Sequence, residues 1–329
     1  MKKIFDGAGK LPAGAVATTV GFCTLANAYN AVGFSGVRHI TMWLGILVWL
    51  VMMVKIIFHF DIFKKEYQQV VPASLYAAVM MLTAILSSYV YPYIPALGVA
   101  LWYLAVVVHA LHILLFTWRN VIRQFNPETF LPSWFVTYVG ILVPVVVGTA
   151  YGNPIVLKGL LIYGLLISAI LLPAMTLRIM KLGMTKQTEL MKTIFLAPPS
   201  LCLVSYFNLT EQPNLLVAGF IYGLLFLISL YILVSLPGFM RRPFNPTFAA
   251  LTFPMAICLI ATLNMSRYLT GLEHLQPGNF LNQFFGIKLY LVTLIIGYVF
   301  YHFMAAFVKE AYKEVEGVQL EKGIEKAAE

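Results

Sequence analysis

The sequence predicts an all-α integral membrane protein in which ten transmembrane helices form five helical hairpins. Hydrophobic residues make up 60% of the 329 residues and charged residues only 11%, whereas soluble domains carry about 25% charged residues. The apolar residues gather in ten runs, each close to the roughly 20 residues that a helix needs to cross a bilayer. These runs show no alternation with a period of two residues, which excludes membrane-spanning β-strands.

Short polar or proline-containing segments separate the expected spans. Residues 67–118 show the pattern most clearly, because this stretch holds two spans and contains no Asp, Glu, Lys or Arg. We expect a single transmembrane domain over residues 1–329, with a short cytoplasmic tail over 309–329 in which Lys and Glu alternate. The ten expected spans cover residues 12–32, 39–59, 72–91, 95–118, 129–150, 155–177, 190–210, 214–236, 246–267 and 286–308.

The basic residues fall almost entirely on one side of this arrangement. Of the 22 Lys and Arg residues, 18 lie on the side that holds both termini, and only Arg38, Lys158, Arg267 and Lys288 lie on the other. Because Lys and Arg concentrate in cytoplasmic loops, we expect a multi-pass protein of the cell membrane with both termini in the cytoplasm. The loops 60–71, 119–128, 178–192 and 237–245 share that side. This topology accounts for the net charge of +9, so no nucleic-acid partner is expected.

The helices repeat as pairs. The stretches LPAGAVATTVGF, VPASLYAAVMML and LPSWFVTYVGIL begin 60 residues apart, at Leu11, Val71 and Leu131. A closer match joins APPSLCLVSYFNL from Ala197 to FPMAICLIATLNM from Phe253, with an offset of 56 residues. The repeating unit is therefore a hairpin of two helices, used five times.

The odd-numbered helices carry Ser, Thr and Asn, whereas the even-numbered ones are mostly Leu, Ile, Val and aromatic residues. Polar groups inside a bilayer face protein or water, so we expect an inner ring of odd helices around a central pore. The alternative is that small residues simply allow tight helix packing. Asn208 and Asn264, near helix ends, either line an outer vestibule or cap those ends. The candidate pore-lining residues are Thr19, Thr83, Thr137, Ser200, Thr252, Asn208 and Asn264.

Prolines interrupt three of the odd helices, at Pro144, Pro198 and Pro254. A proline inside a helix removes a hydrogen bond and bends the helix, and membrane helices tolerate this beside protein or a cavity. Phe253 directly precedes Pro254, so its ring either projects into the pore as a hydrophobic gate or makes an ordinary packing contact.

Other chemical functions find little support. The chain has no HExxH or GxSxG motif and no pair of acids within a span, so we expect neither an enzyme nor a cofactor. Cys23, Cys202 and Cys258 lie in spans without metal-ligand spacing, so no metal site is expected. His109 and His112, three residues apart, are the titratable pair near mid-span. They either make interhelical hydrogen bonds or serve a proton or metal role.

Three stretches, LTFPMAICLIATLN, LPAGAVATTVGF and LAPPSLCLVSYFNL, resemble the tellurite-resistance/dicarboxylate transporter family. This family includes TehA-like bacterial proteins, malate transporters of yeast type and slow-type anion channels of plant guard cells. The resemblance covers about residues 10–308, and its most specific motif is TFPM at Thr252–Met255. It implies a homotrimer of ten-helix protomers, each with a quasi-fivefold inner pore. It also implies that the phenylalanine of this motif, here Phe253, closes the pore.

We therefore expect an anion channel or uniporter that passes small anions such as chloride or nitrate. Its partners would be these anions and the lipid bilayer. Neutral hydroxyl and amide donors suit this task, because a fixed cation at the pore centre would hold an anion too tightly. The alternative is a proton-coupled carrier of C4-dicarboxylates such as malate, or a tellurite-related carrier. Coupling usually requires a buried acid or histidine, and the spans contain no Asp or Glu.

Overall fold

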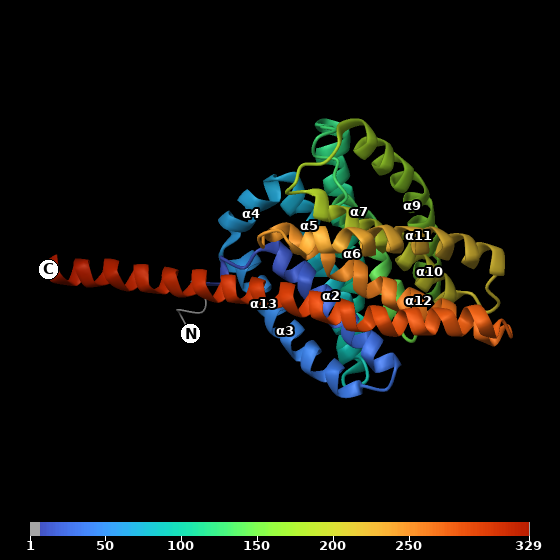
Figure 1. The fold of residues 1–329 in the computed structure, drawn as a ribbon. Helices are drawn as coiled ribbons and strands as arrows, with labels where there is room; N and C mark the ends of the chain where they lie inside the picture. Colours follow the sequence, from blue (N-terminus) through green and yellow to red (C-terminus); the bar gives the residue numbers. More distant parts are fainter. Residues whose placement is uncertain (1–6, 329) are drawn as a thin grey trace.

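The computed structural model describes the backbone of residues 7–328 and the side chains of residues 7–311 (Figure 1). Every regular element in this part of the chain is a helix. Lys2, Lys3 and the tail side chains beyond Ala311 lie outside the described residues. The elements, with short 3-10 and π segments labelled η, are α2 (Ala13–Ala31), α3 (Ser35–Phe58), α4 (Phe60–Gln68), α5 (Val70–Val90), α6 (Pro95–Thr117), η1 (Trp118–Arg123), α7 (Trp134–Tyr138), η2 (Gly140–Leu142), α8 (Val143–Val147), α9 (Pro154–Leu182), η3 (Glu189–Leu196), α10 (Ala197–Leu209), α11 (Leu215–Met240), η4 (Pro246–Leu251), α12 (Phe253–Gly271) and α13 (Leu275–Ala328).

Eight helices in the described part of the chain are long and apolar enough to cross a membrane. They correspond to eight of the ten expected spans. The other two expected spans take different forms. The first is α2, a helix of 19 residues rich in Ala, Gly and Thr. The other is the apolar segment Trp134–Val147, which is divided into α7, η2 and α8.

Burial separates the helices into two sets. Within their apolar stretches, α5 is 72% buried, η3 with α10 is 78% buried and η4 with α12 is 89% buried. In α3, α6, α9, α11 and α13 the buried share is only 28–33%. We call the second set the outer helices. The first set, together with α2, α7 and α8, forms the core helices, whose many small residues allow close packing.

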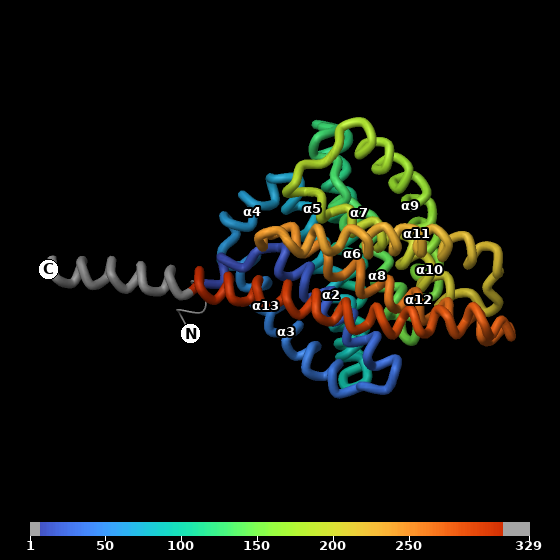
Figure 2. The backbone as a smooth tube through the Cα atoms, viewed as in Figure 1, coloured from blue at the N-terminus to red at the C-terminus, as the bar shows by residue number. Residues whose placement is uncertain are grey.

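The core helices contact one another in a closed order. α2 contacts α5, α5 contacts α7 and α8, α8 contacts α10, α10 contacts α12, and α12 contacts α2. Each outer helix packs against neighbouring core helices. For example, α3 contacts α2 and α5, and α13 contacts α12 and α2. In Figures 1 and 2, the outer helices α3 and α9 accordingly lie at opposite edges of the bundle.

The three predicted proline breaks coincide with changes in helix type. Pro198 and Pro254 lie in the first turn of α10 and α12, and each of these helices follows a 3-10 segment. A first-turn proline costs little, because its missing amide would have no partner within the helix. α10 and α12 begin at Ala197 and Phe253, with the 56-residue offset of the sequence repeat. Pro144 likewise lies at the start of α8, after η2.

Three expected boundaries were wrong. The segment 60–71, expected as a loop, contains the amphipathic helix α4. The span expected at 39–59 begins at Ser35, and the span expected at 286–308 begins at Leu275. The polar residues before these spans lowered the local hydropathy but did not stop the helix. As a result Arg38, expected just before its span, and Lys288, expected near the start of its span, both lie within helices, α3 and α13.

Candidate functional site

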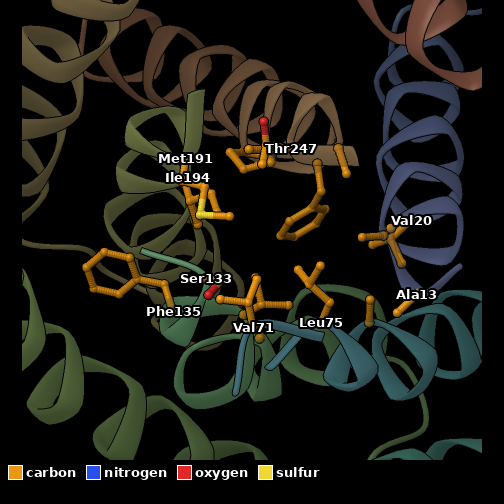
Figure 3. A pocket seen from close by; sticks show the side chains of 18 of the residues that line it. Ala13, Val20, Val71, Leu75, Ser133, Phe135, Met191, Ile194 and Thr247 are labelled. Carbon is orange, nitrogen blue, oxygen red and sulfur yellow. The ribbon is translucent and has the colours of Figure 1, made fainter. Parts of the chain in front are cut away.

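A cavity of about 300 Å³ lies among the N-terminal ends of the core helices. Its lining comes from α2, α5, α7 with η2, η3 with α10, and η4 with α12, so every core helix except α8 contributes. Figure 3 shows side chains from these segments placed around it, including Val20 of α2, Leu75 of α5, Phe135 of α7, Ile194 of η3 and Thr247 of η4. We call this the N-end cavity.

The wall of the N-end cavity is mostly apolar. Its polar side chains, among the described residues, are Glu66, Ser133 and Thr247. Ser133 Oγ is buried and has no hydrogen-bond partner in the described part of the chain. A hydroxyl can both donate and accept, so Ser133 is available to an ion or water that enters the cavity.

Glu66 of α4 brings a carboxylate to this cavity, but its charge is compensated. The buried Nζ of Lys55 donates to Glu66 Oε1 at 2.7 Å and to the Leu11 carbonyl at 2.7 Å. The Tyr76 hydroxyl donates to Glu66 Oε2 at 2.6 Å. A paired and hydrogen-bonded carboxylate of this kind repels an approaching anion much less than a free one.

Phe253 lines the N-end cavity at the start of α12 and is 7% exposed. Helix α2 packs closely against the backbone at this position. A methyl group at Gly21 would lie 2.5 Å from the Phe253 amide nitrogen and 2.7 Å from the Thr252 carbonyl carbon. At the equivalent repeat position, α10 places Ala197 in the cavity wall. Between these two related helix starts, only Phe253 brings an aromatic ring.

A second cavity, of about 460 Å³, lies at the opposite, C-terminal ends of the core helices. Its lining includes residues of α2, α5, α8, α10 and α12. Asn208 and Asn264 both line it, and Asn208 Nδ2 donates to the Val146 carbonyl at 3.0 Å. Asn264 lies well inside α12, which ends at Gly271, so it does not cap that helix. We call this the C-end cavity.

Arg38 is the charged residue among those described in the lining of the C-end cavity. It stands in the first turn of α3 and is half-buried. Its Nε donates to Asn27 Oδ1 at 3.0 Å, and Nη2 donates to the Ser88 carbonyl at 3.4 Å. Neutral partners leave the positive charge uncompensated there, which raises the local concentration of anions.

A short apolar segment separates the two cavities. On α12 the lining of the N-end cavity stops at Pro254, and that of the C-end cavity begins at Ile260. The helical period places Ile257 on the same face between them, and Ile257 is 1% exposed. The same argument places Ile85, also 1% exposed, between the lining residues of α5. Phe253 stands at the edge of this closed segment.

The five hydroxyl residues predicted to line a pore lie elsewhere, outside the described linings of both central cavities. Thr137 donates to the Ser74 carbonyl at 3.2 Å, which joins α7 to α5. The other four donate to carbonyls three or four residues earlier in the chain, a bonding pattern that satisfies a hydroxyl inside protein without water. These four are Thr19, Thr83, Ser200 and Thr252.

His109 and His112 lie one turn apart on the outer helix α6, away from both central cavities. His109 Nε2 is 2.8 Å from the Thr137 carbonyl oxygen, and His112 Nε2 is 3.3 Å from Thr137 Oγ1. His112 Nδ1 is 2.6 Å from the Tyr67 hydroxyl. These contacts join α6 to α7 and α4, as interhelical hydrogen bonds would.

Sequence reasoning did not single out Arg38 and Lys288, two basic residues that the structure places on membrane-spanning helices. Arg38 falls just before the expected span 39–59 and Lys288 near the start of the expected span 286–308, so hydropathy indicates for both only a place on the external side. For Arg38, the available signal was that no proline lies between Ser35 and Ile40. After Pro277, which falls in the first turn of its helix, no further proline interrupts the chain before Lys288.

A family model of voltage-dependent anion channels matches residues 10–305 of the 329. Among curated proteins, no match was found. The matched range contains all the core helices and every residue described here as lining the two cavities. The chain therefore belongs to the voltage-dependent anion channel family.

Proposed function

We propose that this protein is an anion channel or uniporter with a central pore that Phe253 closes. Small anions such as chloride or nitrate would pass from one central cavity to the other when this ring moves aside. One observation carries the proposal. Helices α2, α5, α10 and α12 line both cavities, and the two cavities lie at opposite ends of one short apolar segment beside Phe253. A hydrophobic constriction of this kind stops ions by excluding water.

The chemistry along this path suits ions that must leave as easily as they enter. Ser133 in the N-end cavity and Asn208 and Asn264 in the C-end cavity offer neutral donors. Neutral groups bind an anion weakly, which permits rapid release. Arg38 adds a positive charge at one mouth of the path, where it increases entry without holding the ion at the centre.

The finer architecture belongs to the same proposal. The closed order of core-helix contacts and the 56-residue repeat support ten spans in a quasi-fivefold ring. The excess of Lys and Arg supports cytoplasmic termini in the cell membrane, with the N-end cavity on the cytoplasmic side. A homotrimer is proposed from the resemblance to the transporter family.

A proton-coupled carrier of C4-dicarboxylates is the second candidate, and Glu66 is the observation that favours it. This titratable carboxylate lines the N-end cavity directly, whereas the two buried histidines of α6 do not. A carrier of this kind would take up its dicarboxylate substrate only together with protons.

Purified protein in liposomes distinguishes these two functions. We expect chloride and nitrate efflux to follow the membrane potential and to be independent of a pH gradient. The measurement is a halide-sensitive dye inside the vesicles, with protein-free vesicles as the control. Malate uptake that requires an inward proton gradient, with no chloride flux, would instead establish the carrier.

Arg38→Gln is expected to lower anion conductance several-fold in a Phe253→Ala background, where the pore lacks its ring. The reason is the loss of the positive charge that attracts anions to the C-end cavity. Bilayer recordings at low and high chloride check this, because screening should shrink the difference at high salt. Lys158→Gln, at an exposed position near the start of α9, is the matched control. Equal effects of both variants would contradict a local role for Arg38.

A further inference from the structure

Lys288 is a buried basic residue inside the membrane-spanning part of α13. It is 4% exposed and lies 13 residues after the start of the helix at Leu275, which is roughly 20 Å along its axis. An ionisable side chain at this depth is costly and in membrane proteins usually has a function. Nothing in the path described above uses it.

All three protons of the Lys288 ammonium group have a target, and every target is neutral. Nζ donates to Cys258 Sγ at 3.1 Å and to Thr262 Oγ1 at 3.1 Å. Nζ also lies 4.8 Å from the centre of the Phe284 ring, a cation–π geometry. Thr262 gives its own proton to the Cys258 carbonyl at 2.8 Å, so its oxygen is free to accept. This set of partners fits the charged form of lysine, which has three donors and no acceptor.

The charge of Lys288 has no counterion in the described structure. Among the described residues no carboxylate lies within ion-pair distance of Nζ. From residue 212 to residue 309 the sequence holds one acid, Glu273, which follows the end of α12. The void beside Lys288 measures about 10 Å³, which is room for about one water molecule. A counter-charge for Lys288 must therefore come from elsewhere.

The position of Lys288 relative to the two cavities indicates that this counter-charge is an anion in the pore between them. Its partner Cys258 lies on α12 between Pro254, which lines the N-end cavity, and Ile260, which lines the C-end cavity. Lys288 thus stands at the level of the closed apolar segment, one to two turns beyond Phe253. α13 runs directly against α12 (Figure 1), so a single helix separates the ammonium group from the central axis.

From this arrangement we infer that Lys288 is the residue that makes the narrow part of the pore selective for anions over cations. The inference rests on the proposed function, since it assigns the selectivity of that same pore. The ammonium group acts from behind α12 through its electric field, so it attracts a passing anion without binding it. Because the surroundings are apolar, the field is weakly screened. A unit charge about 10 Å away, at an effective dielectric constant near 20, changes ion occupancy roughly ten-fold.

The test measures the chloride-to-sodium permeability ratio from reversal potentials under a NaCl gradient, in the Phe253→Ala background. Lys288→Met should lower this ratio at least about ten-fold, and Lys288→Arg should preserve it. Lys288→Gln, which keeps hydrogen-bonding capacity without charge, should behave like the methionine variant. It also provides a second test if the methionine variant does not fold. Lys158→Met, on the exposed start of α9, removes a charge at a distance and should leave the ratio unchanged.

The outcomes separate this inference from the proposed function. If Phe253→Ala conducts and Lys288→Gln keeps its permeability ratio, the assignment of Lys288 is overturned while the channel stands. If Lys288→Arg loses selectivity as fully as Lys288→Gln, the role is one of packing and the assignment also fails. A folded Phe253→Ala protein with no anion current refutes the pore itself, and with it this inference.

Discussion

Phe253→Ala is expected to open a conductive anion pathway and to raise chloride conductance at least about ten-fold over the native protein. The ring lines the N-end cavity at the edge of the apolar segment between the two cavities. Its removal widens that segment and admits water, which removes the hydrophobic barrier. A ten-fold rise corresponds to a barrier lower by about 1.4 kcal/mol, and loss of a whole aromatic ring should exceed this.

The experiment compares single-channel or macroscopic currents in planar bilayers at matched protein density. Phe220→Ala is the matched control, because Phe220 of α11 is 76% exposed on the outer surface and distant from both cavities. Phe253→Leu should stay largely closed, since a large apolar side chain still fills the segment. Removing a buried phenylalanine costs about 3–5 kcal/mol of stability, so folding is verified by size-exclusion chromatography. A folded but silent Phe253→Ala protein would falsify the gate.

Gly21→Ala is expected to destabilise the protein by about 1–3 kcal/mol, the usual cost of overpacking a core. The added methyl group would lie 2.5 Å from the Phe253 amide nitrogen and 2.7 Å from the Thr252 carbonyl carbon. Both are backbone atoms, so they cannot give way by a change of rotamer. α2 and α12 must separate at the place that positions the Phe253 ring, and a small leak current should accompany the loss of stability.

Thermal unfolding in detergent, followed by the loss of the monodisperse peak, measures the effect on stability. Gly223→Ala in α11 is the matched control, because a methyl group there meets no atom within 4 Å. In a helix interior this exchange is otherwise favourable by up to about 1 kcal/mol. Equal melting temperatures for the Gly21 and Gly223 variants would contradict the close contact between α2 and α12.

Hydropathy and the internal repeat predicted most of the architecture. Apolar runs near the length of a bilayer located eight helices that are able to span it. The offset of 56 residues placed the starts of α10 and α12, at Ala197 and Phe253, in register. The contrast between small, hydroxyl-bearing helices and bulky ones separated core from outer helices, as burial later showed. Each of these features depends on the residues of individual segments and on their spacing, so the sequence alone can predict it.

The candidate site was harder to predict, because polarity alone does not say which way a side chain points. Thr19 was expected at a pore, yet its hydroxyl donates to the Ala15 carbonyl at 2.8 Å within its own helix. Asn208 and Asn264 do line the C-end cavity. An asparagine side chain has more donors and acceptors than one nearby carbonyl can satisfy, whereas a single threonine hydroxyl can be satisfied by its own helix.

Composition and spacing were enough to identify a multi-pass membrane protein, to find the 56-residue offset between two related stretches, and to locate the aromatic residue before Pro254. These conclusions depend on composition and spacing along the chain. The folded structure was needed to show which residues surround the two cavities, and that Arg38 lines one of them while Lys288 is buried against α12. The reason is that burial and charge compensation depend on neighbours distant in sequence. Lys288, for example, meets Cys258 and Thr262 across 30 and 26 residues of chain.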